Sequence, residues 1–140
     1  MKARASTDAT PRLGAPLAVA GIGVAGAVLL RIRDPHVQGA YGLCPFHALT
    51  GWWCPACGGM RAVNDLTHGD VGAALSSNLF VPPLAVLALL LWLRWVQLRL
   101  RGSELRPLSL SNRAVVGIVV VAIVFTVLRN TPSGSWFAPT

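Results

Sequence analysis

The sequence predicts an all-α integral membrane protein with three transmembrane helices and a short helical, cysteine-bearing interfacial segment between the first and the second. Hydrophobic residues make up 54% of its 140 residues and charged residues only 12%, whereas roughly a quarter of the residues in a soluble domain are charged. The apolar excess lies in three runs that are almost free of charge, at 13–30, 79–98 and 114–128. Runs of this composition are typical of helices that span a membrane.

The first apolar run, 13–30, follows a polar segment at 1–12 that we expect to be a disordered tail. As a helix, the run would be about 27 Å long, which approaches the thickness of the hydrocarbon core. It ends in Leu-Leu-Arg-Ile-Arg without a small-residue cleavage site, so we interpret it as an anchor rather than a signal peptide. Its pairs of small residues four apart favour close packing of another helix: Gly21 with Ala25, and Gly23 with Ala27. We therefore expect contacts with membrane lipid and with a partner membrane protein or a second copy of the chain.

The second run, 79–98, contains the pair Pro82-Pro83 close to its start. Proline is harmful inside a helix but fits the first turn, where the backbone N–H groups have no partners. We therefore expect this helix to begin near Val81. Trp92 and Trp95 suit the membrane–water boundary at its other end.

The third run, 114–128, is rich in valine and isoleucine and somewhat short for a span. We expect Arg113 and Arg129, at its two ends, to extend to the membrane surface. The C-terminal tail, 129–140, is expected to carry an interfacial anchor made by Trp136 and Phe137.

Positive charges predict the orientation of the helices. Eight of the 12 lysines and arginines lie in the N-terminal tail, near the end of the second run and in the basic loop 99–113. Because such segments stay in the cytoplasm, we expect a cytoplasmic N-terminus and a cysteine segment on the outer face of a cell membrane, although Arg31 and Arg33 oppose this assignment. No basic run is interleaved with aromatic residues, so the net charge of +7 does not indicate nucleic-acid binding.

Chemically reactive side chains gather in the connecting segment 31–78, which holds all three cysteines. Cys44 and His47 form a CxxH pair, and Cys54 and Cys57 form a CxxC pair six residues later. Two residues between ligands allow a tight turn to direct both side chains at one ion. The four residues together would make a tetrahedral Cys₃His site of the structural zinc kind.

Two other interpretations of the cysteines remain open. A CxxC pair at the start of a helix can have a lowered thiol pKa, which would suit a membrane thiol–disulfide oxidoreductase that acts through Cys54 and Cys57. Cys44 would then be a resolving thiol or a spectator. Alternatively, the cysteines form a structural disulfide or are buried thiols without chemistry. We rank the metal site first and the redox pair second.

The helix expected after the cysteines carries a polar stripe at helical spacing, made by Arg61, Asn64, Asp65 and His68. The stripe either lines a site with the cysteines or is the solvated face of an interfacial helix, and we favour the solvated face. Gly69 is expected to end this helix, and Asp70 to cap a short helix over Val71–Ser77. The motif His68-Gly69-Asp70 is therefore explained as a joint between helices, without catalysis.

The segment CPFHALTGWWCPACGGMRA, followed by HGDVGAALSSN, resembles a bacterial membrane-protein family called domain of unknown function 2752 (DUF2752). The resemblance covers roughly 43–93 and rests on these matching positions: Cys44, Pro45, Leu49, Thr50, Gly51, Cys54, Pro55, Cys57, Gly58, Arg61, Ala62, His68, Gly69, Asp70 and Asn78. It implies a small helical membrane protein and no activity. Because His47 occupies a position that varies in this family, the fourth ligand is also open to a water, His68 or a side chain of a partner protein.

These observations predict a non-catalytic membrane subunit or accessory protein whose cysteine segment binds a zinc-like metal or is locked by a disulfide. The oxidoreductase is the alternative, and a protein that only packs against lipid and other helices is the third.

Overall fold

The computed structural model describes residues 13–37, 39–42, 44–103, 111–132 and 134, and the regular secondary structure within them is entirely helical. Three helices are long: α1 (Gly14–Ile32), α5 (Val81–Leu100) and α6 (Asn112–Arg129). Each of the three is long and apolar enough to cross a membrane. The prediction of an all-α protein with three membrane-crossing helices is confirmed. The expected tail at 1–12 and the expected anchor at Trp136 and Phe137 lie outside the described residues.

Three short helices lie between α1 and α5: α2 (Pro45–Thr50), α3 (Gly59–Thr67) and α4 (Val71–Ser77). One or two short helices were expected here, and α2 is the addition. Pro45 occupies the first turn of α2, where its fixed φ favours the helix and its missing N–H costs nothing. Gly51 ends the helix with a φ of 71°, a left-handed conformation that glycine adopts without steric cost.

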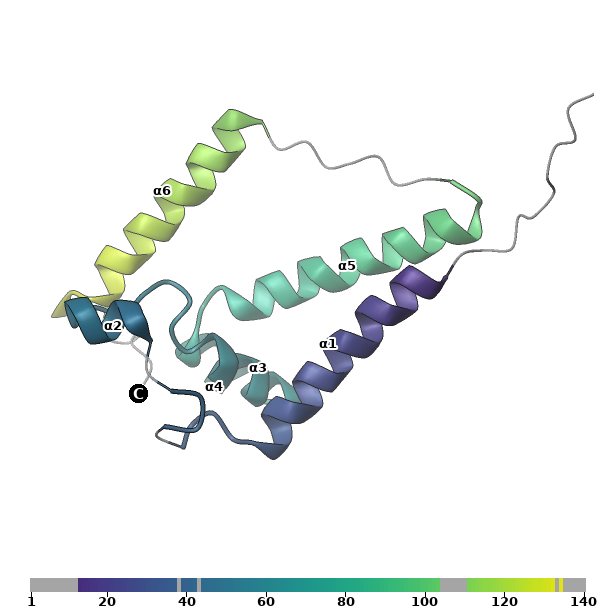
Figure 1. Ribbon diagram of the computed structural model, residues 1–140. Helices are drawn as coiled ribbons and strands as arrows, with labels where there is room; N and C mark the ends of the chain where they lie inside the picture. The colour runs from purple at the N-terminus through teal and green to yellow at the C-terminus, as the bar shows by residue number, and fades with distance from the viewer. Residues whose placement is uncertain (1–12, 38, 43, 104–110, 133, 135–140) are drawn as a thin grey trace, which may run out of the picture.

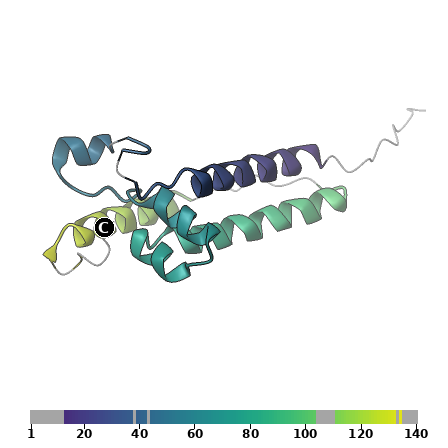
Figure 2. The ribbon, with the colours of Figure 1, turned by 90° about the horizontal axis from the view of Figure 1, so that it is seen from below.

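The helices α1 and α5 lie next to each other, with α3 and α4 at one end of the pair (Figures 1 and 2). They converge at the end remote from α3 and α4, where the indole Nε1 of Trp92 donates a hydrogen bond to the carbonyl of Pro16 over 3.0 Å. The well-packed interior lies at the other end, where Ala62 of α3 and Ala74 of α4 are fully buried. The packed core is therefore a small region between the short helices and the adjoining ends of α1 and α5.

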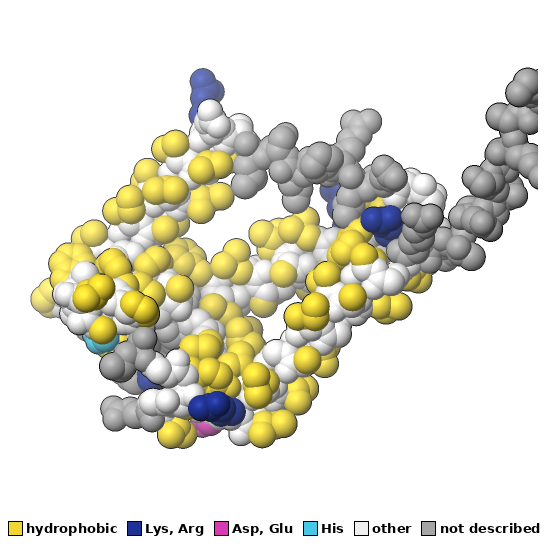
Figure 3. All heavy atoms as spheres, viewed as in Figure 1, with side chains coloured by type: hydrophobic (Ala, Val, Ile, Leu, Met, Phe, Trp, Pro, Cys, Tyr) yellow, Lys and Arg dark blue, Asp and Glu magenta, His cyan; other side chains and the backbone are white. Residues whose placement is uncertain are grey.

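The helix α6 stands apart from the other two long helices, and open space separates it from α5 in the space-filling view (Figure 3). Within the described residues it packs against none of the other five helices. Its C-terminal end lies at the end of the molecule that carries α2, whereas its N-terminal end points away (Figure 1). The ends of the long helices alternate in this way, as three successive membrane crossings require.

Apolar side chains cover the outer surface of the long helices (Figure 3). Ile22 on α1 is 74% exposed, and Leu90 on α5 and Val116 on α6 are similarly open. Monomeric soluble proteins rarely expose continuous apolar surface of this extent. The surface therefore suits lipid or other membrane helices.

Candidate metal centre

The three cysteines lie at the starts of two short helices. Cys44 is the residue that precedes α2. Cys54 and Cys57 belong to a turn at residues 54–57, which we call the cysteine turn. It is closed by a 3.1 Å hydrogen bond from the Cys57 N–H to the Cys54 carbonyl. Gly58, with a φ of 80°, then leads directly into α3. The CxxC pair therefore stands at the start of a helix, as the sequence predicts.

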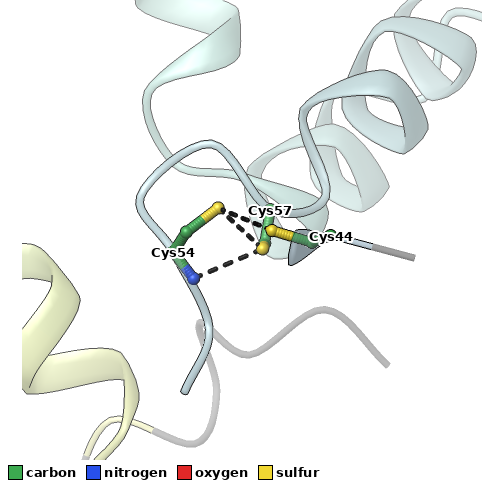
Figure 4. Close-up of side chains that lie close together, drawn as sticks. All are labelled: Cys44, Cys54 and Cys57. Atoms are coloured by element: carbon green, nitrogen blue, oxygen red, sulfur yellow. Dashed lines mark hydrogen bonds between the residues drawn. The ribbon is translucent and has the colours of Figure 1, made fainter. Parts of the chain in front are cut away.

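The three sulfur atoms converge on one another (Figure 4). Cys54 Sγ lies 2.7 Å from Cys57 Sγ and 3.6 Å from Cys44 Sγ, and all three sulfur atoms lie within 4.8 Å of one another. In a tetrahedral zinc site with Zn–S bonds of ~2.3 Å, the sulfur atoms are about 3.8 Å apart. Since the cysteines are free thiols, small movements would bring three sulfur ligands onto one ion.

The structure brings together three of the four residues predicted as metal ligands. His47 is not in the cluster of three sulfur atoms; its ring stacks on Trp53, with 3.9 Å between the ring centroids and 10° between the planes. Its Nδ1 atom is buried without a hydrogen-bond partner among the described residues. His68 is exposed, and its Nδ1 lies 2.9 Å from the Asn64 carbonyl of its own helix. The fourth ligand stays a prediction.

Two of the thiols differ in their tendency to ionise. Burial raises the pKa of Cys57 to about 12, and its side-chain hydrogen bond with Cys54 acts in the same direction. A hydrogen bond from the backbone N–H of His47, at the start of α2, lowers the pKa of Cys44 below its ordinary value. A metal ion must displace the thiol protons to bind. Cys44 is therefore the easier ligand to deprotonate, and Cys57 requires the ion itself to favour its thiolate.

Two buried side chains hold the backbone of the cysteine turn. Nη1 of Arg129 donates to the carbonyls of Cys54 and Cys57, over 2.8 and 3.2 Å. The amide nitrogen of Asn78 donates to the carbonyls of Pro55 and Cys57, over 2.9 and 3.1 Å. Asn78 also accepts the N–H of Phe80, just before α5, over 3.0 Å. The turn is thus attached on one side to the start of α5 and on the other to the end of α6.

The expectation that Arg129 extends to the membrane surface is wrong, because its residue surface is only 1% exposed. The adjacent Asn130 exchanges two hydrogen bonds with the backbone of Trp53, over 2.8 and 3.0 Å. Phe125, one turn before Arg129, packs on Phe80 with 4.4 Å between the ring centroids. A sequence signal did exist: the positive-inside rule disfavours an arginine at the outer end of a helix. An arginine found there against the rule, such as Arg129, is therefore a candidate for a structural role.

The interpretation of the α3 polar stripe as a solvated face is wrong for Asn64 and Asp65, although His68 is exposed. Asn64 and Asp65 are buried, and the Asn64 amide donates to the Leu30 carbonyl over 2.7 Å. Asp65 accepts a 2.7 Å hydrogen bond from the hydroxyl of Ser77 in α4. The physical reason is that the last carbonyls of α1 have no partners within their own helix. Asn64 supplies a donor to that helix end, and Arg61 donates to the Pro35 carbonyl, in the loop after α1, over 3.3 Å.

His36 is a polar residue of this region that the sequence analysis did not single out. Its Nδ1 lies 2.8 Å from Asp34, and its Nε2 lies 3.4 Å from Asp65 of α3. Hydrogen bonds from the backbone N–H and the ring of His36 keep the pKa of Asp34 below its ordinary value. His36 thus connects the loop after α1 to α3.

The joint between α3 and α4 forms as expected. Gly69 has a φ of 80°, and Asp70 caps α4 by accepting the N–H of Ala73 over 2.8 Å. Both residues are exposed, on the surface of the joint. The geometry accounts for the Gly-Asp pair without a chemical role.

The sequence profile of a family described as "Protein of unknown function (DUF2752)" matches residues 44–92. No curated protein and no solved structure matches the chain. The matched segment contains the three cysteines, the helices α2 to α4, Asn78 and more than half of α5, whereas Arg129 and α6 lie beyond it. Residues 44–92 are therefore similar to the DUF2752 family, which supports the resemblance seen in the sequence.

Proposed function

We propose that this small multi-pass membrane protein is a non-catalytic subunit or accessory protein whose three cysteines hold a zinc-like metal ion. One observation carries the proposal: sulfur atoms from two separate helix starts lie within 4.8 Å of one another. Soft thiolate ligands in a tetrahedral arrangement favour zinc over magnesium or calcium. An ion at this point would join the start of α2 to the start of α3.

The surroundings of the cysteines favour a structural role over thiol–disulfide exchange. A catalytic CxxC pair needs an exposed thiolate that attacks the partner disulfide. Here a third sulfur atom, Cys44 Sγ, lies 3.6 Å from Cys54 Sγ, and the backbone of the turn is held by Arg129 and Asn78. Such a turn is suited to fixing ligands in place. The oxidoreductase that uses Cys54 and Cys57 is kept as the alternative outcome of the test below.

The test is to measure metal content and thiol content in the same sample of protein purified in detergent. We expect about one divalent ion per chain and thiols that react fully only after a chelator is added. Cys44→Ser and Cys57→Ser should each lower the bound metal strongly, while Ser76→Ala, an exposed hydroxyl on α4, should not. A stoichiometric disulfide without metal would overturn the proposal. Mixed disulfides trapped by Cys57→Ser would then favour the redox alternative.

The fourth ligand can be identified by comparing the three histidines of the chain. His47→Ala should weaken metal binding if the ring leaves its stack on Trp53 to bind the ion. His68→Ala should do so if that side chain turns away from the Asn64 carbonyl. His36→Ala is the matched control, because its ring is occupied between Asp34 and Asp65. Unchanged binding in all three variants would assign the fourth position to water or to a partner protein.

We also infer that the N-terminus is cytoplasmic and that the cysteine segment faces outward. The four arginines that would lie outside each have an internal use, which explains why they are present against the charge rule. Arg31 donates to the Thr67 carbonyl, Arg33 lies over the ring of Tyr41, Arg61 donates to the Pro35 carbonyl, and Arg129 holds the cysteine turn. A reporter fused after Arg101 should be cytoplasmic, and one fused after Thr140 should be outside. Both reporters on one side would contradict three crossings.

A further inference from the structure

Among the described residues, the buried charge of Arg129 has no carboxylate as a counter-ion. Its residue surface is 1% exposed, and within the described part of the chain the ionisable groups near it are the thiols of Cys57 and Cys54, with no carboxylate among them. Nη1 is satisfied by two carbonyls of the cysteine turn, but Nε and Nη2 are buried without a hydrogen-bond partner in that part. A buried cation of this kind is costly unless a negative charge lies near it.

The metal site itself would supply that negative charge. Three thiolates carry three negative charges, and a divalent ion carries two positive charges. The loaded site therefore has a net charge of minus one. A neutral fourth ligand, such as histidine or water, leaves this value unchanged. The single positive charge of Arg129 balances it, whereas in the metal-free protein with neutral thiols the same charge is uncompensated.

We propose that Arg129 is the counter-charge of a metal–tris(thiolate) centre, and that metal binding by Cys44, Cys54 and Cys57 thereby fixes α6 to the cysteine segment. This inference rests on the proposed function and extends it to the third membrane helix. Arg129 acts here as a positioning residue, through its charge and its hydrogen bonds to the turn.

Metal binding can affect the position of α6 because few contacts hold this helix. Within the described residues α6 packs against no other helix. The contacts at its C-terminal end are made by Phe125, Arg129 and Asn130, which reach Phe80, the cysteine turn and Trp53. No long packed surface holds the helix when these contacts weaken, so the position of α6 depends on the state of the turn.

The first experiment measures zinc affinity of the full-length chain in detergent, by competition with a chromophoric chelator. Arg129→Gln removes the charge but keeps an N–H donor, and it should weaken zinc binding at least tenfold. Arg129→Lys keeps the charge and should remain within about threefold of wild type. Arg113→Gln, an exposed arginine at the other end of the same helix, should change nothing. Equal affinity of Arg129→Gln and wild type, or equal losses in the Gln and Lys variants, would overturn the counter-charge.

The second experiment needs no variant of Arg129 and so remains decisive if Arg129→Gln fails to fold. Spin labels are placed on non-natural amino acids at Val19 of α1 and Val120 of α6, both about half exposed. Zinc-loaded protein should give a narrow distance distribution that broadens or shifts after chelation. A control pair at Val19 and Leu90 of α5 should not respond. An α1–α6 distance distribution that is the same with and without zinc would overturn the coupling of metal binding to α6. Absence of zinc binding by the wild-type protein would overturn the proposed function itself.

Discussion

The helices α1 and α5 are held by contacts among helices, whereas α6 is held by contacts with a loop. Asn64 of α3 donates a hydrogen bond near the C-terminal end of α1, and Trp92 of α5 donates one to Pro16 near the start of α1. The helices α3 and α4 also pack on α5. The end of α6 reaches the cysteine turn and its neighbours through Arg129 and Asn130. Three long helices of similar length and composition are thus positioned by two different physical means.

The difference locates the point where chemistry at the cysteines affects the fold. Most contacts of α1 and α5 involve helix ends and buried side chains away from the sulfur atoms, and only the start of α5 is attached to the cysteine turn, through Asn78. Contacts of α6 end on the carbonyls of Cys54 and Cys57, the residues that carry two of the three sulfurs. A change in the cysteine turn should therefore move α6 more than α1 or α5, because α5 is also held by its packing on α3 and α4.

The largest expected effect is on thiol reactivity in reduced, metal-free protein. Cys44, with its lowered pKa, should be alkylated first as the pH rises, and Cys57 should resist up to a pH of about 12. The measurement is mass spectrometry of alkylated peptides after short pulses of iodoacetamide. Faster reaction of Cys57 than of Cys44 would contradict the buried position of Cys57.

The same shift has a consequence for stability. Cys57 has a higher pKa in the folded chain than the ordinary value of 9.0, so the folded state binds the proton more tightly. Its contribution is fully present below pH 9 and is lost as the pH rises from 9 towards about 12. The free energy of unfolding of metal-free protein should therefore fall across that interval, which chemical denaturation in detergent at a series of pH values measures.

The next largest effect is expected for Asn78→Ala, which removes the link between the cysteine turn and the start of α5. The buried carbonyls of Pro55 and Cys57 would each lose a donor. We expect a loss of about 2–3 kcal/mol in the free energy of unfolding, together with weaker zinc binding. Asn112→Ala, at an exposed position in α6, is the control. Unchanged zinc affinity would show that the turn does not need this support.

Asn64→Ala tests the contacts among helices that hold α1. The amide is buried and donates to the Leu30 carbonyl at the end of α1. Its removal should cost about 1–2 kcal/mol in the free energy of unfolding, because one buried acceptor loses its partner. Zinc affinity and the α1–α6 distance should stay at wild-type values. Release of α6 by this variant would mean that the two regions are not independent.

Much of this architecture could be predicted from local sequence. Hydropathy alone locates the three long helices, the double proline places the start of α5 at Val81, and Gly69 with Asp70 marks the α3–α4 joint. The close spacing of the CxxC pair likewise predicts neighbouring sulfur atoms. These features depend on residues that are near one another in the chain.

The errors concern polar residues whose partners are distant in sequence. Periodicity places Asn64 and Asp65 on one face of α3, but it cannot distinguish a face towards water from a face towards the unpaired carbonyls of another helix. Arg129 lies 75 residues from Cys54, and its sequence neighbours indicate only a membrane boundary. Burial of a charge is decided by what surrounds it in three dimensions, which a single sequence does not show.

The smallest expected effect tests the interpretation of Asp70 as a helix cap. Its carboxylate accepts the N–H of Ala73 in the first turn of α4, and the residue is exposed. Asp70→Ala should therefore cost about 1 kcal/mol in the free energy of unfolding, whereas Asp70→Asn should cost only a few tenths, because asparagine caps helices equally well. Thermal unfolding in detergent, with zinc affinity measured in parallel, distinguishes the two variants.

A carboxylate that bound the ion or took part in a reaction could not be replaced by asparagine. Loss of zinc affinity in Asp70→Asn would therefore assign this residue to the metal site. Because α4 adjoins the packed end of α1 and α5, neither variant should move α6. If Asp70 only stabilises the first turn of α4, its loss should not affect the cysteine turn. The comparison requires this result, because α4 belongs to the packed region of α1 and α5 and not to the contacts of α6.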